Sequence, residues 1–169
     1  MKEIAQLLGR MVSAGIIKNY AVFGAVAQMR YTEPVATLDV DVLVEVASPD
    51  RLDVLAPIYE FCSGQGYAAE GEAIRVADWP LQLVPAFSAL TFEALANAET
   101  ADYEGVPLRV VRADYLAVIA LEVGRPKDFA RVLALLESGS ATVSDVAALA
   151  LRFGADGAWQ RFKARFLSD

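Results

Sequence analysis

The sequence contains no histidine and a single cysteine, Cys62. The lack of histidine excludes Ser-His and Cys-His nucleophilic catalysis and any zinc site that needs an imidazole. One cysteine cannot form an internal disulfide, which suits a reducing cytoplasm, so we expect a cytoplasmic protein. Acid–base chemistry must then come from carboxylates, lysine, tyrosine or metal-bound water. Cys62 falls in the apolar stripe of a predicted helix, and we interpret it as a core residue.

Long apolar runs are also missing from the sequence. The longest, such as residues 115–121, fall far short of the roughly 20 residues that cross a bilayer. The first ten residues, MKEIAQLLGR, carry Glu3 and lack the apolar core and cleavage site of a signal peptide. We therefore expect neither membrane insertion nor a signal peptide.

Basic residues are outnumbered by acidic ones, 15 against 22, giving a net charge of −7. Proteins whose function is bulk nucleic-acid binding are usually basic. We therefore expect no dedicated DNA binding, although a local contact with RNA stays open.

The pattern of apolar residues predicts one domain that spans residues 1–169. Strands and helices mix in a sheet core of about 18–112, and helices alone follow in about 113–169, which indicates an α+β fold. Strands are expected at 20–24, at a segment that carries Asp39 and Asp41 and ends near 46, and at 74–77, 81–84 and 106–111. Helices are expected at 2–17, just after Gly24, and at 49–63, 92–98, 114–123, 126–137, 144–153 and 159–167.

Asp39 and Asp41 stand two residues apart in a run of valine and leucine. In a strand this spacing places both carboxylates on one face, where burial of two like charges is costly unless a cation compensates. Oxygen ligands favour a hard ion such as Mg²⁺. The alternative is that this face is simply solvated. Against it, Leu43 shares the face.

Gly24 ends an apolar segment and is followed by the small residue Ala25. A glycine at a strand-to-helix turn lets the backbone approach a phosphate, and the first amides of a helix offer unpaired donors. A phosphate-binding turn followed closely by a carboxylate pair is typical of a nucleoside triphosphate site.

At this point the sequence resembles the DNA polymerase β-like nucleotidyltransferase superfamily, and more closely the small bacterial members of the abortive-infection and toxin–antitoxin type. The residues that carry the resemblance are Gly24-Ala25, Tyr31, Pro34 and Thr37-Leu38-Asp39-Val40-Asp41. It covers about residues 18–137. It implies a nucleotidyltransferase-like mixed β-sheet flanked by helices, with a helical C-terminal part.

The resemblance also implies a site. Asp39 and Asp41 would be the catalytic carboxylates and would hold Mg²⁺ or Mn²⁺. The nucleotide triphosphate would be bound by Gly24, Ala25, Thr37, Arg125 and Lys127. The alternative for Arg125 and Lys127 is a structural role at a helix end, where Asp128 suits the helix dipole.

Three positions depart from the pattern of the resembling family. Gln82 stands where a later strand normally supplies a third carboxylate, and it brings neither charge nor a base. Asp78 is close to it in sequence, at a predicted turn. Glu122 stands where a lysine is expected near the triphosphate, and Ala36 replaces a basic residue before Thr37. The alternative for Gln82 is an ordinary polar residue on a half-exposed strand.

Three functions remain open. The first is a metal-dependent enzyme, catalytically weakened, that transfers a nucleoside monophosphate from a nucleotide triphosphate to a hydroxyl on RNA, protein or a small molecule. The second is a non-catalytic module of the same fold that binds a nucleotide or a partner protein. A glycosyltransferase also uses two aspartates at this spacing, but the chain is too short for its usual sheet.

Overall fold

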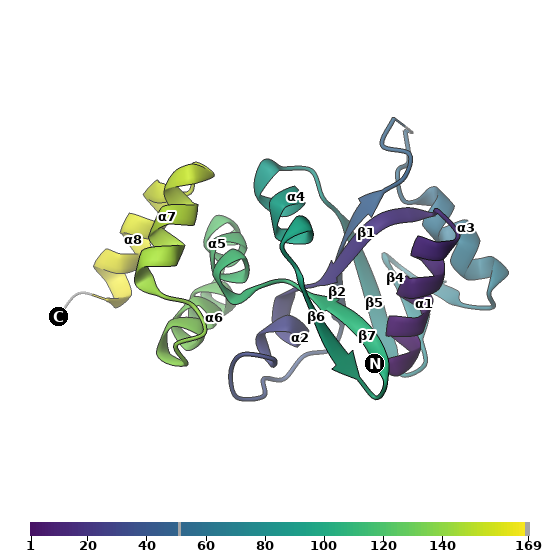
Figure 1. Ribbon diagram of the computed structural model, residues 1–169, viewed down its shortest axis with the longest axis horizontal. Coiled ribbons are helices and arrows are strands. Elements are labelled where there is room, and N and C mark those ends of the chain that lie inside the picture. Colours follow the sequence, from purple (N-terminus) through teal and green to yellow (C-terminus); the bar gives the residue numbers. More distant parts are fainter. Residues whose placement is uncertain (51, 168–169) are drawn as a thin grey trace.

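The computed structural model describes residues 1–50 and 52–167, which form a mixed sheet and a set of helices (Figure 1). The strands are β1 (Ile17–Val22), β2 (Val40–Val46), β3 (Ala68–Glu70), β4 (Ala73–Val76), β5 (Trp79–Pro85), β6 (Glu99–Tyr103) and β7 (Val106–Val110). The helices are α1 (Lys2–Ser13), α2 (Gly24–Gln28), α3 (Ala56–Gly64), α4 (Ala89–Ala96), α5 (Ala113–Val123), α6 (Pro126–Glu137), α7 (Val143–Arg152) and α8 (Asp156–Phe166).

The seven strands form one sheet in the order β3-β4-β5-β2-β1-β7-β6. β2 lies at its centre, antiparallel to β1 and parallel to β5. The valines of β2 explain this place, because Val40, Val42 and Val44 are fully buried on one face. The α+β fold class that the sequence predicts is confirmed, with a sheet that mixes parallel and antiparallel pairs.

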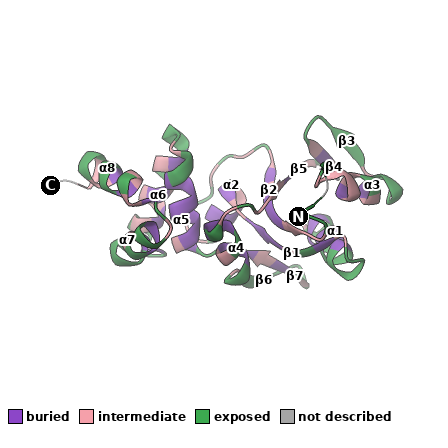
Figure 2. Cartoon of the chain, turned by 90° about the horizontal axis from the view of Figure 1, so that it is seen from above, coloured by how far each residue is buried: buried purple, intermediate pink, exposed green. Residues whose placement is uncertain are grey.

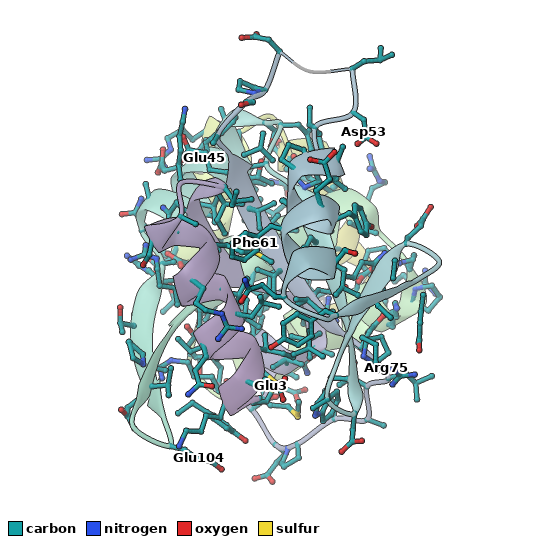
Figure 3. The ribbon with its side chains drawn as sticks, turned by 90° about the vertical axis from the view of Figure 1, so that its right-hand side faces the viewer. Glu3, Glu45, Asp53, Phe61, Arg75 and Glu104 are labelled. Atoms are coloured by element: carbon teal, nitrogen blue, oxygen red, sulfur yellow. The ribbon has the colours of Figure 1, made fainter. Side chains whose placement is uncertain are left out.

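α1 and α3 lie side by side over one face of the sheet (Figure 3). α1 buries Ile4, Leu7, Leu8 and Met11, which recur every three or four residues along the helix and so share one side of it. α4 packs on β1 and β2, and the Asn19 side chain of β1 donates a hydrogen bond to the carbonyl of Leu95 in α4.

The C-terminal helices α6, α7 and α8 lie around α5, on the side of the sheet away from α1 and α3 (Figure 1). α5 is buried over most of its length (Figure 2), and eight of its eleven residues are buried. It contacts α2, α4, α6, α7 and α8. A helix that is apolar all round belongs in a core, and α5 therefore joins the sheet region to the last helices. Within the described residues, no helix is long and apolar enough to cross a membrane.

Several predicted boundaries are wrong. The first helix ends at Ser13 rather than 17, because Gly15 takes a left-handed conformation with φ of +70° and the chain enters β1 at Ile17. The helix expected at 49–63 begins only at Ala56, where Asp53 Oδ1 accepts hydrogen bonds from the backbone amides of Leu55 and Ala56. Position 51 of the predicted helix lies outside the described residues.

Two strands were not predicted from the sequence, β3 and β6. Both are mostly exposed edge strands, and each pairs with the strand that follows it, β3 with β4 and β6 with β7. Glu104 and Gly105 form the turn of the second hairpin, between β6 and β7.

Candidate functional site

Gly24 and Asp41 are in direct contact where β1 leads into α2. Gly24 is the first residue of α2 and has φ of +67°, a left-handed conformation that a residue with a side chain rarely adopts. A Cβ atom at this position would overlap Asp41 Oδ2 and lie 3.2 Å from the Cβ and Cγ atoms of Asp41. The backbone amide of Phe23 also donates to the carbonyl of Asp41, at 2.9 Å. Only glycine therefore lets the turn approach this carboxylate so closely.

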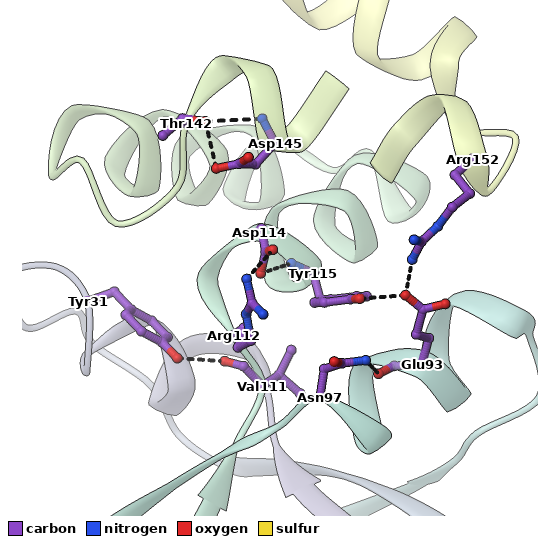
Figure 4. Close-up of polar contacts among 10 residues, drawn as sticks. All are labelled: Tyr31, Glu93, Asn97, Val111, Arg112, Asp114, Tyr115, Thr142, Asp145 and Arg152. Atoms are coloured by element: carbon purple, nitrogen blue, oxygen red, sulfur yellow. Dashed lines mark hydrogen bonds and ion pairs between the residues drawn. The ribbon is translucent and has the colours of Figure 1, made fainter. Parts of the chain in front are cut away.

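Asp39 lies just before β2 rather than inside it, because β2 begins at Val40. The Thr37 hydroxyl lies 3.0 Å from the backbone carbonyl oxygen of Asp39 and 3.2 Å from Asp39 Oδ1. The loop before Asp39 is fixed at its start by Tyr31, whose hydroxyl donates to the carbonyl of Val111 at 3.0 Å (Figure 4). Thr37 therefore orients Asp39 and does so from within a fixed loop.

A cavity of about 600 Å³ opens beside these residues. It brings together predicted site residues from both parts of the chain: Gly24, Ala25, Thr37, Asp39, Asp41, Arg125 and Lys127. Its apolar wall comes from α5 and α6, with Leu116, Ile119, Ala120, Val123, Ala130 and Ala134. Residues separated by about 100 positions thus face one another across a space large enough for a small ligand.

The charge of Asp39 acts on the carboxyl group of Asp41 in the same cavity. The pKa of Asp41 is raised, first because the carboxyl is partly buried and then because of the negative charge of Asp39. The charges of Arg131, Lys127 and Arg125 act in the opposite direction without cancelling this effect. Asp41 is therefore a carboxylate that gains from a further cation nearby.

Asp128 organises the cationic side of the cavity. Its side chain is only 1% exposed and accepts hydrogen bonds from Arg125 Nε at 2.7 Å and from Arg131 Nη1 at 3.2 Å. It also accepts from the backbone amide of Arg125 and so caps α6. Burial acts to raise the pKa of Asp128, but the hydrogen bonds and charges of the two arginines outweigh it, and the pKa lies below its ordinary value.

Sequence reasoning missed two residues of this site, Gln28 and Arg131. Arg131 Nε donates to Gln28 Oε1 at 3.1 Å, which joins α6 to α2 across 103 residues. The signal was present but easily overlooked: Arg131 follows Asp128 by three residues and therefore lies on the same side of α6. Gln28, only 6% exposed, sits on the buried side of α2.

Gln82 stands directly beside Asp41 on the neighbouring parallel strand. The register of β2 and β5 pairs Asp41 with Gln82, so both side chains project from the same face of the sheet. Gln82 is not among the described residues that line the cavity, and Asp78 is exposed in the turn between β4 and β5. In residues 1–50 and 52–167 no cluster of three or more aspartate, glutamate or cysteine side chains is positioned to hold a metal.

Glu122 does not lie where the sequence predicts. It lines a second cavity, of about 500 Å³, between the end of α5 and α8, together with Arg161 and Arg165. Residues of an α-helix are rotated by about 100° from one to the next, so Ile119 and Ala120 of α5 face the first cavity instead, and Val123 lines both cavities. Among the described residues, Glu122 is therefore not part of the lining of the cavity that contains Asp39 and Asp41.

The donor set of the cavity fits a hard divalent ion. Mg²⁺ is commonly bound by one or two carboxylates, with water and substrate phosphates filling its other positions. Asp39 and Asp41 line the same cavity and repel each other, as the raised pKa of Asp41 indicates. These two residues would hold the ion.

Comparisons with known proteins were made in sequence and in structure. No family model matches the sequence, and no curated protein matches it. The structure is similar to that of ANT(2″)-Ia in complex with adenylyl-2″-tobramycin, with a TM-score of 0.53 and 15% identity over 96% of each chain. It is also similar to an antigenic nucleotidyltransferase-like protein from Paracoccidioides brasiliensis, with a TM-score of 0.52 and 11% identity over 98% of this chain and 95% of that one.

Identities this low show the fold alone. The predicted nucleotidyltransferase-like fold is confirmed, and the resemblance to the abortive-infection and toxin–antitoxin type stays a prediction. One of these neighbours is described as nucleotidyltransferase-like, and this chain shares the fold of both.

Proposed function

We propose that the chain is a nucleotidyltransferase that transfers a nucleoside monophosphate from a nucleotide triphosphate to a hydroxyl acceptor. The observation that carries the proposal is the contact between Gly24 and Asp41 in a cavity that also holds Asp39, Arg125 and Lys127. Carboxylates for a metal ion and cations for phosphates then face one space. The bound adenylyl-2″-tobramycin of ANT(2″)-Ia supports this reaction class for the fold.

In the proposed reaction the acceptor oxygen forms a bond to the α-phosphorus, and the bond from that phosphorus to the departing diphosphate breaks. Asp39 and Asp41 would hold Mg²⁺, which would neutralise charge at the phosphates. Arg125 and Lys127 bind the phosphate groups, and Gly24 and Ala25 let the backbone approach them. The hydroxyl proton goes to solvent, because Gln82 cannot accept it.

The second candidate is a non-catalytic module of the same fold that binds a nucleotide or a partner protein. The observation that favours it is the pairing of Asp41 with a neutral glutamine, Gln82, where a third carboxylate would complete the metal site. Electrostatic stabilisation is usually the largest part of catalysis, and loss of one such group costs roughly 10²–10³ in rate. We therefore expect the wild-type chain to bind nucleotide triphosphate with Mg²⁺ and to transfer the nucleoside monophosphate slowly.

Gln82→Asp tests which candidate holds. With an α-labelled nucleotide triphosphate and Mg²⁺, this variant should transfer label to acceptors about 10²-fold faster than wild type, because it restores a carboxylate beside Asp41. Gln160→Asp, a matched change on the exposed side of α8, should leave the rate unchanged. Glu122→Lys should also have no effect, since Glu122 lies outside the cavity.

Rapid transfer by wild type that Gln82→Asp diminishes would show that Gln82 is not a missing acid. Nucleotide binding without transfer in either protein would leave the non-catalytic module. Absence of nucleotide binding with Mg²⁺ or Mn²⁺ would contradict both candidates as nucleotide-dependent proteins.

A further inference from the structure

Arg131 is an unusual charge for the position it occupies. Its side chain is only 11% exposed, yet it lines the cavity that contains Asp39 and Asp41. A guanidinium carries five N–H donors in a planar fork. Arg131 Nε donates to Gln28 and Nη1 donates to Asp128. Within the described residues, neither hydrogen bond uses Nη2, and this nitrogen is not among the buried atoms without a partner.

The two hydrogen bonds hold the guanidinium in one orientation. Gln28 comes from α2 and Asp128 from α6, so the guanidinium of Arg131 is hydrogen-bonded to two of the helices that border the cavity. Asp128 is itself fixed by Arg125. A pre-organised arginine loses little freedom when it binds an anion, which makes it a better phosphate ligand than a mobile lysine.

Arg131 lines the same cavity as Asp39 and Asp41. Among the described residues that line the cavity, three are carboxylates, Asp39, Asp41 and Asp128, and three are cations, Arg125, Lys127 and Arg131. Because these charges are equal in number, the wall is already neutral before any metal ion binds.

We propose that Arg131 is a built-in cation of the site that binds the phosphates of the nucleotide directly and lets the chain hold a triphosphate without a divalent metal. The inference rests on the proposed function, which supplies the nucleotide. It goes beyond it because Arg131 then acts beside the carboxylate pair, where a cation is otherwise recruited from solution. Arg125 and Lys127 approach the phosphates from the exposed start of α6.

The competing explanation is that Arg131 only ties α6 to α2. In that case its loss would lower stability and would leave the affinity for phosphate groups unchanged in the folded protein. The two roles therefore separate when binding is measured with and without phosphates on the ligand, and with and without metal.

The experiment measures binding of a nucleotide triphosphate and of the matching nucleoside by calorimetry, in Mg²⁺ and in EDTA. Wild type should bind the triphosphate in EDTA more tightly than the nucleoside. Arg131→Gln should weaken triphosphate binding in EDTA about tenfold to a hundredfold, as expected for loss of charged hydrogen bonds, and should leave nucleoside binding unchanged. Arg131→Lys keeps the charge but lacks the planar guanidinium. Its affinity for the triphosphate in EDTA should lie between the affinities of wild type and of Arg131→Gln.

Arg152→Gln is the matched control, because Arg152 also pairs with a carboxylate but is not among the described residues that line the cavity. It should bind the triphosphate as wild type does. If Arg131→Gln does not fold, Gln28→Leu serves in its place, because it frees Nε and keeps the charge. It should weaken metal-free triphosphate binding several-fold.

Four outcomes would overturn the inference. Wild type that binds the triphosphate in Mg²⁺ but not in EDTA would reject the built-in cation and leave the proposed function standing. Equal triphosphate affinities of wild type and folded Arg131→Gln in EDTA would reduce Arg131 to a structural tie. Gln28→Leu with wild-type affinity would show that the orientation is irrelevant. No triphosphate binding in either buffer would remove the proposed function as well.

Discussion

Asp128 and Glu93 are both carboxylates whose hydrogen bonds connect helices, but Asp128 is buried and Glu93 is partly exposed. Asp128 accepts hydrogen bonds from Arg125 and Arg131, and through Arg131 it connects α6 with α2. Glu93 of α4 accepts from the hydroxyl of Tyr115 in α5, at 2.6 Å, and from Arg152 in α7 (Figure 4). The Asp128 side chain is 1% exposed, whereas that of Glu93 is 36% exposed.

The difference in depth decides what each carboxylate does. Water screens the Glu93 cluster, so its ion pair contributes little beyond holding three helices in place. The Asp128 cluster is desolvated, so its charges interact strongly and depend on one another. A buried cluster that lines a cavity can act on a ligand, and an exposed one serves mainly as a contact. Three predictions test this contrast.

The largest effect is expected from Asp128→Asn. Removing this buried charge leaves Arg131 without its anion and should lower the free energy of unfolding by about 3 to 5 kcal/mol at pH 7, measured by urea denaturation. The pKa of Asp128 is lowered in the fold, so its stabilisation is present above the ordinary aspartate pKa and is lost as the pH falls through the folded value. The gap between wild type and variant should therefore close in acid. A gap that stays constant with pH would contradict the role of the charge.

The second effect concerns metal and belongs to the cavity that the Asp128 cluster lines, through Asp39 and Asp41. Mg²⁺ at a hundredfold excess over its Kd should stabilise wild type by about 2.7 kcal/mol, because it binds the folded chain alone. Asp39→Asn combined with Asp41→Asn should abolish this gain, as read from the thermal midpoint. Glu93→Gln should keep the gain in full. Absence of any shift in wild type at millimolar Mg²⁺ or Mn²⁺ would argue against the metal site.

The smallest effect is expected from Glu93→Gln itself. The Arg152 pair is exposed, and glutamine still offers an oxygen to the Tyr115 hydroxyl, so the free energy of unfolding should fall by about 0 to 1 kcal/mol. Added salt should reduce the difference further, because it screens exposed charges. A loss as large as that of Asp128→Asn would mean that depth does not separate the two clusters.

The sequence was most informative where local geometry limits the choice of residue. Gly24 must be glycine to meet Asp41, and the spacing of Asp39 and Asp41 places them at one end of a buried strand. The sequence therefore predicted the carboxylate side of the cavity and its glycine turn. It also predicted the nucleotidyltransferase-like fold.

The cationic side depends on packing between helices, which spacing alone does not determine. Arg131 reaches the cavity only because α6 packs on α2, where Gln28 accepts its hydrogen bond from 103 residues away in the sequence. Glu122 was misplaced for the same reason: it lies two steps of 100° along α5 from Ala120, which lines the first cavity, and it lines the second cavity instead. The exposed strands β3 and β6 owe their form to pairing with neighbours rather than to their own residues.

The burial of α5 has a consequence for how the chain can vary. α5 begins within three residues of the end of β7, and α6, with Arg125, Lys127 and Arg131, begins within three residues of its end. The length of α5 therefore sets the distance between the carboxylates at the sheet and the cations at the start of α6 and within it. Exchange of one apolar residue of α5 for another leaves this distance unchanged. Insertion of one residue would lengthen it by about 1.5 Å and turn α6 by about 100°, carrying the cations away from Asp41.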